Sequence, residues 1–154
     1  QDGFRLVLAG MRGYTAPAID ARIAELGLRD EIELTGWIPR AQVIELFRRA
    51  MAFVYPSHFE GFGMPVAEAM AAGVPLACSD IEPLRSVCGD AGLMFPPGDV
   101  AAIAAALDRL TADAALREQL TAKGRERAAA FTWTRAAQKT LEVLEATARM
   151  RTRG

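Results

Sequence analysis

Short apolar runs alternate with helical patterns along the chain, and this alternation restricts the fold more than any other feature of the sequence. Runs typical of buried strands are expected at residues 5–9, 32–34, 52–55, 74–78 and 92–95. Helical spacing of apolar residues predicts helices at residues 17–26, 40–50, 65–72, 100–111, 114–131 and 133–151, with a single helical turn at 84–87. Strands that alternate with helices favour a parallel sheet with helices on both faces, which is a Rossmann-like α/β fold.

The composition fits one domain over residues 1–154, with the late helices 100–151 packed on the sheet. Hydrophobic residues make up 51% and charged residues 24%, as in ordinary globular proteins. The net charge of −1 argues against a nucleic-acid-binding protein, and no apolar run is long enough to span a membrane. Cys78 and Cys88 lack metal-ligand spacing and His58 is the single histidine, so we expect reduced thiols in a cytoplasmic protein and no metal site.

Two carboxylates, those of Glu60 and Glu68, mark the strongest candidate for a functional site. Glu68 is the only charged residue in the range 61–78, and a carboxylate isolated among small and apolar residues must find partners. Pro65 suits the first position of a helix, so we expect Glu68 in the first helical turn, at the same end of the helix as Glu60. The alternative is that Glu68 only complements the helix dipole.

A glycine turn, Gly61-Phe62-Gly63, lies between the two carboxylates. Ligands of parallel sheets bind at the carboxyl ends of the strands, and Glu60 follows the strand expected at 52–55. Carboxylates accept hydrogen bonds from sugar hydroxyls, while free N–H groups at a helix N-terminus donate to phosphate or hydroxyl oxygens. The residues therefore favour a polyhydroxylated, anionic ligand.

The segment at residues 56–75, PSHFEGFGMPVAEAMAAGVP, resembles the signature of retaining family 4 (group 1) glycosyltransferases of the GT-B fold. The family motif has two glutamates separated by seven residues, which Glu60 and Glu68 match. Residues 35–38, 89–93 and the helix after 131–133 are similar to further family positions, so the resemblance covers nearly the whole chain. It implies the C-terminal, donor-binding half of a hexosyltransferase. Such an enzyme transfers a sugar from a nucleotide-diphosphate-sugar with retention of configuration, without a metal or other cofactor.

The resemblance also implies a role for each matching residue. Glu60 is similar to the glutamate that contacts hydroxyls of the donor sugar, and it is the candidate catalytic residue. Glu68 is similar to the glutamate that binds the ribose diol of the nucleotide. The backbone that would hold the sugar and the distal phosphate belongs to Gly61, Phe62, Gly63 and Met64. The turn that would line the base consists of Gly36, Trp37 and Ile38.

Three further side chains have two interpretations each. His58 could reach the ligand or be an ordinary surface histidine. Arg12, in a Gly-x-x-Gly turn after the first strand, could meet a phosphate or lie in solvent. Trp37 could stack on a base or pack in the core.

Departures from the family pattern predict that the isolated chain is inactive. The family binds the diphosphate with an arginine and a lysine upstream of the position of Arg5, on a segment that also supplies a central strand. The only lysines here are Lys123 and Lys139, and Ser86 stands where the family usually has glutamate. The acceptor, a glycan or a lipid-linked sugar, would bind to an N-terminal domain that this sequence does not include.

Two alternatives to a part of an enzyme remain open. The chain could be a non-catalytic nucleotide-sugar-binding module, completed by another chain, by a homo-oligomer or by strand exchange. It could also be an interaction domain that keeps the motif as a structural element. The basic residues near the C-terminus could complement a helix end or contact anionic lipid at the inner face of the membrane, and they are Arg149, Arg151 and Arg153.

Overall fold

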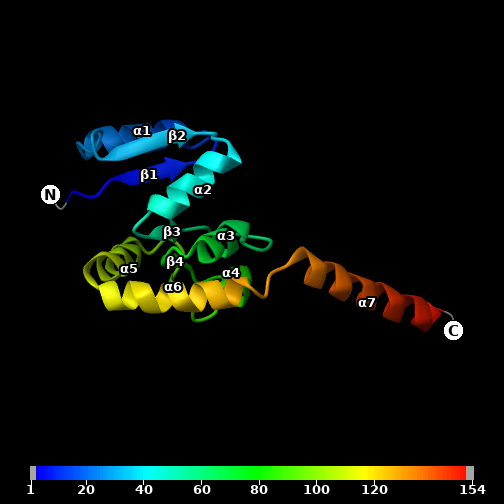
Figure 1. Ribbon diagram of the computed structural model, residues 1–154. Coiled ribbons are helices and arrows are strands. Elements are labelled where there is room, and N and C mark those ends of the chain that lie inside the picture. Colours follow the sequence, from blue (N-terminus) through cyan, green and yellow to red (C-terminus); the bar gives the residue numbers. More distant parts are fainter. Residues whose placement is uncertain (1–2, 152–154) are drawn as a thin grey trace. The chain divides into compact units, whose positions relative to one another are not determined.

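The computed structural model describes residues 3–151. Its contacts divide the chain into two compact units, residues 1–46 and residues 47–154, and each is described by itself. Both units pair their strands in parallel and connect them through helices, so the predicted α/β class is confirmed (Figure 1). The assignment of residues 1–154 to one donor-binding domain stays a prediction.

The first unit holds β1 (Leu6–Ala9), α1 (Ala16–Glu25), β2 (Ile32–Gly36) and most of α2 (Arg40–Arg49). The two strands pair in parallel, from Leu6 opposite Ile32 to Ala9 opposite Gly36. As predicted, α1 stops before Gly27, which has a φ of 69° in the left-handed region that favours glycine.

The second unit holds β3 (Phe53–Tyr55), α3 (Met64–Ala72), β4 (Leu76–Ser79), α4 (Glu82–Cys88), β5 (Leu93–Phe95), α5 (Val100–Ala112), α6 (Ala114–Ala128) and α7 (Trp133–Arg151). Its strands are parallel in the order β3-β4-β5, with Tyr55 opposite Cys78 and Cys78 opposite Met94. The described strands do not form one continuous sheet. β1 forms its ladder only with β2, and β3 only with β4, so there are two sheets.

The core of the second unit surrounds β4, the middle strand of its sheet. All four residues of β4 are fully buried, because helices cover both faces of a parallel sheet. A cluster on one face combines residues of β4, β5, α5 and α6, namely Ala77, Phe95, Ala106, Leu110 and Leu120. The two cysteines are buried and free, as predicted. The pKa of Cys78 is raised, first because its thiol is hydrogen-bonded to Cys88 and then because it is buried.

α6 supports both α3 and α4. A Cβ added to Gly124 of α6 would lie 3.4 Å from Cγ of Met70 on α3, so these helices approach closely. Arg127 of α6 donates from Nε to the carbonyl of Val87 and from Nη2 to the carbonyl of Ser86, both at 2.5 Å. These carbonyls belong to the last turn of α4, where no further helical N–H follows to satisfy them.

α7 differs from the expectation that all late helices pack on the sheet. α5 contacts β4 and β5, and α6 contacts α3 and α5. The side chains at residues 133–150 are all exposed, because its apolar residues, Leu141, Val143 and Leu144 among them, meet no covering element. In the described part of the chain, no helix has the length and hydropathy that a bilayer span requires. Of the basic C-terminal residues, Arg149 bonds Glu145 at 3.3 Å, whereas Arg153 and the side chain of Arg151 lie outside the described residues.

Candidate ligand site at the loop between β3 and α3

The loop between β3 and α3 ends in a glycine that no other residue can easily replace. Gly63 precedes the first residue of α3 and has a φ of 97°, in the left-handed region. A Cβ at this position would lie only 2.4 Å from Cδ2 of Leu84, which is fully buried on α4. Conformation and space therefore both require glycine where the loop becomes a helix.

The position of Glu68 in α3 differs from the prediction. The helix begins at Met64 rather than Pro65, because Gly63 takes the left-handed conformation that starts it, and Pro65 is then the second residue. Glu68 is thus the fifth helical residue and lies in the second turn, and the first turn contains no acidic residue. Its side chain is half-buried beside the buried Ala67 and Ala69.

Glu60 is held by a tyrosine at the end of β3. The hydroxyl of Tyr55 donates a hydrogen bond to Oε1 of Glu60 at 2.6 Å, and both side chains are half-buried. The pKa of Tyr55 is raised to about 12, first by burial and then by the hydrogen bond to Glu60 and its charge. Across residues 3–151, no other group bonds Glu60, so Oε2 is available to a ligand.

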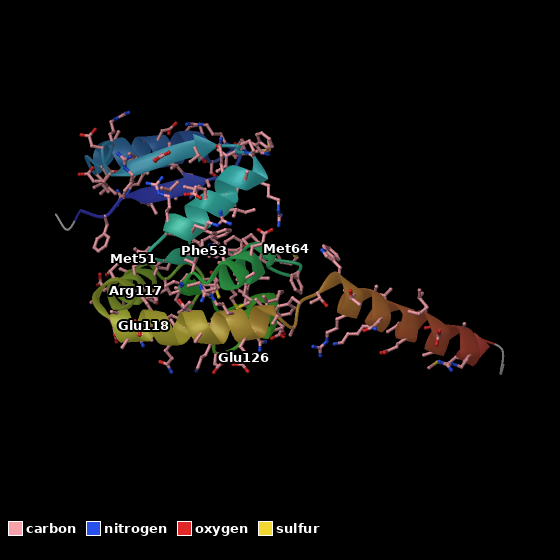
Figure 2. The ribbon with its side chains drawn as sticks, viewed as in Figure 1. Met51, Phe53, Met64, Arg117, Glu118 and Glu126 are labelled. Atoms are coloured by element: carbon pink, nitrogen blue, oxygen red, sulfur yellow. The ribbon has the colours of Figure 1, made fainter. Side chains whose placement is uncertain are left out.

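The backbone after Glu60 presents a row of free donors. Among the described residues, no acceptor bonds the N–H groups of Gly61, Phe62, Gly63 and Met64. The helix N-terminus has no side-chain cap, and its first carbonyl-bonded N–H groups are those of Val66 and Ala67, which reach Gly63. The side chain of Met64 is exposed beside this row (Figure 2). A carboxylate acceptor and several free donors thus adjoin each other along the chain.

Aromatic side chains flank the loop. Phe59 is 87% exposed, and Phe62 packs edge-on against Phe131 with ring centroids 5.7 Å apart. His58 is exposed, and its ring lies over Gly98 in the turn after β5, where an added Cβ would come within 3.2 Å of Cε1. His58 is thus on the surface, and the interpretation that it reaches the ligand stays a prediction.

The other predicted residues belong to the first unit. Arg12 forms an ion pair with Asp20 of α1, and the interpretation that it meets a phosphate stays a prediction. Trp37 is 71% exposed, so the interpretation that it packs in the core is wrong. Gly36 ends β2 with a φ of 65°. The assignment of Gly36, Trp37 and Ile38 to a nucleotide base stays a prediction.

Two residues near this edge of the second sheet were not singled out from the sequence. The sequence did offer one indication of Tyr55: it is a polar residue at the carboxyl end of an expected strand, five residues before Glu60. Asp80 follows β4 at the same edge and forms an ion pair with Arg85. The pKa of Asp80 is lowered because Arg85 donates a hydrogen bond to its carboxylate.

The fold and the site together define an α/β protein that has a carboxylate and a glycine turn after one of its parallel strands. The chain belongs to the group 1 glycosyl transferases, whose family model matches residues 1–127. It is 39% identical over 139 residues to the O-antigen chain mannosyltransferase B of Escherichia coli, covering 90% of this chain and 36% of the relative. It is 35% identical over 125 residues to the phosphatidyl-myo-inositol mannosyltransferase of Mycobacterium leprae, covering 79% of this chain and 33% of the relative.

Solved structures show the same fold. The sucrose-phosphate synthase of Thermosynechococcus elongatus superposes with a TM-score of 0.84 at 30% identity, over 95% of this chain and 39% of that protein. HepE of Anabaena, in complex with UDP and glucose, superposes with a TM-score of 0.83 at 19% identity, over 92% of this chain and 40% of that protein. The chain spans about a third of the length of each of these two mannosyltransferases.

Proposed function

We propose that this chain binds the nucleotide-diphosphate-sugar donor of a retaining hexosyltransferase. The observation that carries the proposal is the Tyr55-bound carboxylate of Glu60 next to four unpaired N–H groups at residues 61–64. A sugar hydroxyl donates to a carboxylate, and a phosphate oxygen accepts from N–H groups at a helix N-terminus. Membership of the group 1 family supports the donor class.

In this proposal, the chemistry depends on position and charge. Breaking the anomeric bond leaves negative charge on the diphosphate, which donors fixed in advance stabilise more in the transition state than in the ground state. The N–H groups at residues 61–64 and the dipole of α3 supply that stabilisation. Glu60 is the candidate catalytic residue, because its carboxylate would touch the reacting sugar and stabilise positive charge that develops on it. No residue is assigned as a nucleophile, and no metal takes part.

Glu68 is proposed to bind the ribose diol. A carboxylate accepts from both hydroxyls of a vicinal diol. The hexose proposed first is mannose, because the similar proteins from Escherichia coli and Mycobacterium leprae are named mannosyltransferases. Transfer to a glycan or lipid-linked acceptor is proposed for an enzyme of which this chain is one part.

Calorimetric titration of the 154-residue chain tests the proposal. The panel contains UDP, GDP and ADP, each alone and as its hexose conjugate. We expect one nucleotide-sugar to bind more tightly than its own nucleoside diphosphate, and Glu68→Gln to cost about 1–3 kcal/mol of binding free energy through a lost charged hydrogen-bond partner. Glu126→Gln is the matched control, because Glu126 is an exposed residue on α6 (Figure 2). The proposal is wrong if the chain binds no member of the panel. An unchanged affinity of Glu68→Gln would instead favour a structural role for the motif.

A further inference from the structure

Tyr55 is supported by a buried sheet and by a row of aromatic rings. It is the last residue of β3 and lies opposite Cys78 of the fully buried β4. Its ring stacks on that of Phe53, with centroids 5.9 Å apart and planes 22° from parallel. Phe53 in turn packs edge-on against Phe47 at 5.2 Å. Residues two apart in a strand share one face of the sheet, so this row of rings fixes where the phenol points.

Glu60 has no comparable support of its own. It lies in the loop at residues 56–63, outside any helix or strand. Within residues 3–151, the only other side-chain hydrogen bond of this loop runs from Oγ of Ser57 to the carbonyl of Phe59, at 2.9 Å. A glutamate side chain that is free to rotate loses conformational entropy when a ligand orders it. The 2.6 Å bond from Tyr55 is the contact that restricts this carboxylate before any ligand arrives.

The direction of the bond decides what Glu60 offers to a ligand. Because the phenol donates to Oε1, the carboxylate keeps Oε2 and its remaining lone pairs as acceptors in a fixed direction. The phenol stays protonated at neutral pH, since its pKa is about 12. An acceptor fixed in this way binds a sugar with a hydroxyl at one position more tightly than a sugar whose hydroxyl points elsewhere.

We infer that Tyr55 is a positioning residue, which fixes the carboxylate of Glu60 and thereby sets which hydroxyl of the donor sugar the site selects. The inference rests on the proposed function. It deepens that function because it assigns sugar discrimination to a residue that touches no substrate. Binding of the nucleotide part does not involve Tyr55.

Tyr55→Phe is the direct test, because it removes one oxygen and leaves the ring stack. The matched control is Tyr14→Phe, since Tyr14 is the only other tyrosine and is fully exposed. Affinities are measured by calorimetry for the nucleoside diphosphate, for its hexose conjugate and for conjugates that each lack one sugar hydroxyl. Far-UV circular dichroism and the urea midpoint establish that each variant is folded.

We expect Tyr55→Phe to weaken the hexose conjugate about 3- to 10-fold, the range of a single net hydrogen bond, and to leave the nucleoside diphosphate within about twofold. One deoxy conjugate should bind equally to the wild type and to Tyr55→Phe, because the hydroxyl that Glu60 selects is already missing. The double variant Tyr55→Phe/Glu60→Gln should lose no more than Glu60→Gln alone, since the two residues act through one contact. Tyr14→Phe should match the wild type.

Two results would overturn the inference while leaving the proposed function intact. One is an unchanged affinity of Tyr55→Phe for the hexose conjugate. The other is an equal loss for the nucleoside diphosphate and all its conjugates, which would indicate a general structural effect. If the wild type binds neither the nucleoside diphosphate nor the conjugates, the proposed function is wrong and the inference falls with it.

Discussion

Replacing Gly63 with alanine should destabilise the second unit by about 1–4.6 kcal/mol. An L-residue held in the left-handed region costs about 1–2 kcal/mol, and Gly63 has a φ of 97°. The new Cβ would lie 2.4 Å from Cδ2 of the fully buried Leu84, and such overpacking costs about 1–3 kcal/mol. The smaller entropy of the unfolded alanine chain offsets only about 0.4–1 kcal/mol of this sum.

Urea unfolding, followed through the NMR signals of β4, measures this loss for the second unit. Gly61→Ala is the matched control, because a Cβ there meets nothing within 4 Å and its φ is not positive. We expect Gly61→Ala to change the free energy of unfolding by less than about 0.5 kcal/mol, as at other open surface positions. The two variants place the same methyl group two residues apart in one loop.

A double variant separates the backbone cost from the overlap. Leu84→Ala alone should cost about 2–5 kcal/mol, because it leaves a cavity in the core. In Gly63→Ala/Leu84→Ala the overlapping methyl group is gone, so the double variant should be more stable than the sum of the singles by about 1–3 kcal/mol. The reasoning is refuted if Gly63→Ala is as stable as Gly61→Ala, or if the two single effects simply add.

Three smaller effects follow from individual contacts. Glu60→Gln should lower the pKa of Tyr55 from about 12 but leave it above 10, because burial is the larger cause of the shift. Ring-carbon NMR of labelled tyrosine measures this pKa. A value that stays at about 12 would contradict the assigned hydrogen bond. Asp99→Ala should destabilise α5 by about 1 kcal/mol, because Oδ1 of Asp99 accepts from the N–H of Ala102 at 2.9 Å and so caps the helix. Urea unfolding measures this loss, and an unchanged unfolding midpoint would exclude the cap. Lys123→Gln should raise the pKa of Asp90, which Lys123 now lowers through a 2.7 Å bond. Since a lowered carboxyl pKa contributes stability that is lost as pH falls through it, the variant should lose less stability on acidification than the wild type.

The order of strands and helices could be predicted because local residues decide it. Gly27 and Gly73 both follow helices with positive φ, and a glycine just past a helical pattern is a local signal. The residues themselves do not predict the partition into two sheets, because strand pairing depends on which strands lie side by side; only the family resemblance pointed to a missing central strand. The predicted position of Glu68 was wrong by one residue, which moves it from the first turn to the second. Pro65 indicated a helix start without showing that the left-handed Gly63 lets the helix begin one residue earlier.

The residues proposed for the site could be named from the sequence, but the contacts that hold them in place could not. Glu60 and the glycine turn are recognisable from spacing alone. The bond from Tyr55 depends on how the loop folds back toward its own strand, and the closeness of Leu84 to Gly63 depends on how α4 packs beside the N-terminus of α3. Neither contact leaves a periodic or compositional signal. The sequence therefore predicts which groups would meet the proposed ligand, and the structure adds the contacts that hold those groups.

The hydrogen bonds from Arg127 to α4 connect the glycine turn with the C-terminal end of α6. Leu84, which shapes the space at Gly63, lies on the short helix whose final carbonyls Arg127 binds. A shortened protein that ended before Arg127 would keep every residue of the motif at 56–75. It would still lose the two hydrogen bonds that hold the last turn of α4, the helix that carries Leu84. We therefore expect that the smallest fragment able to bind the proposed ligand includes Arg127 as well as the signature.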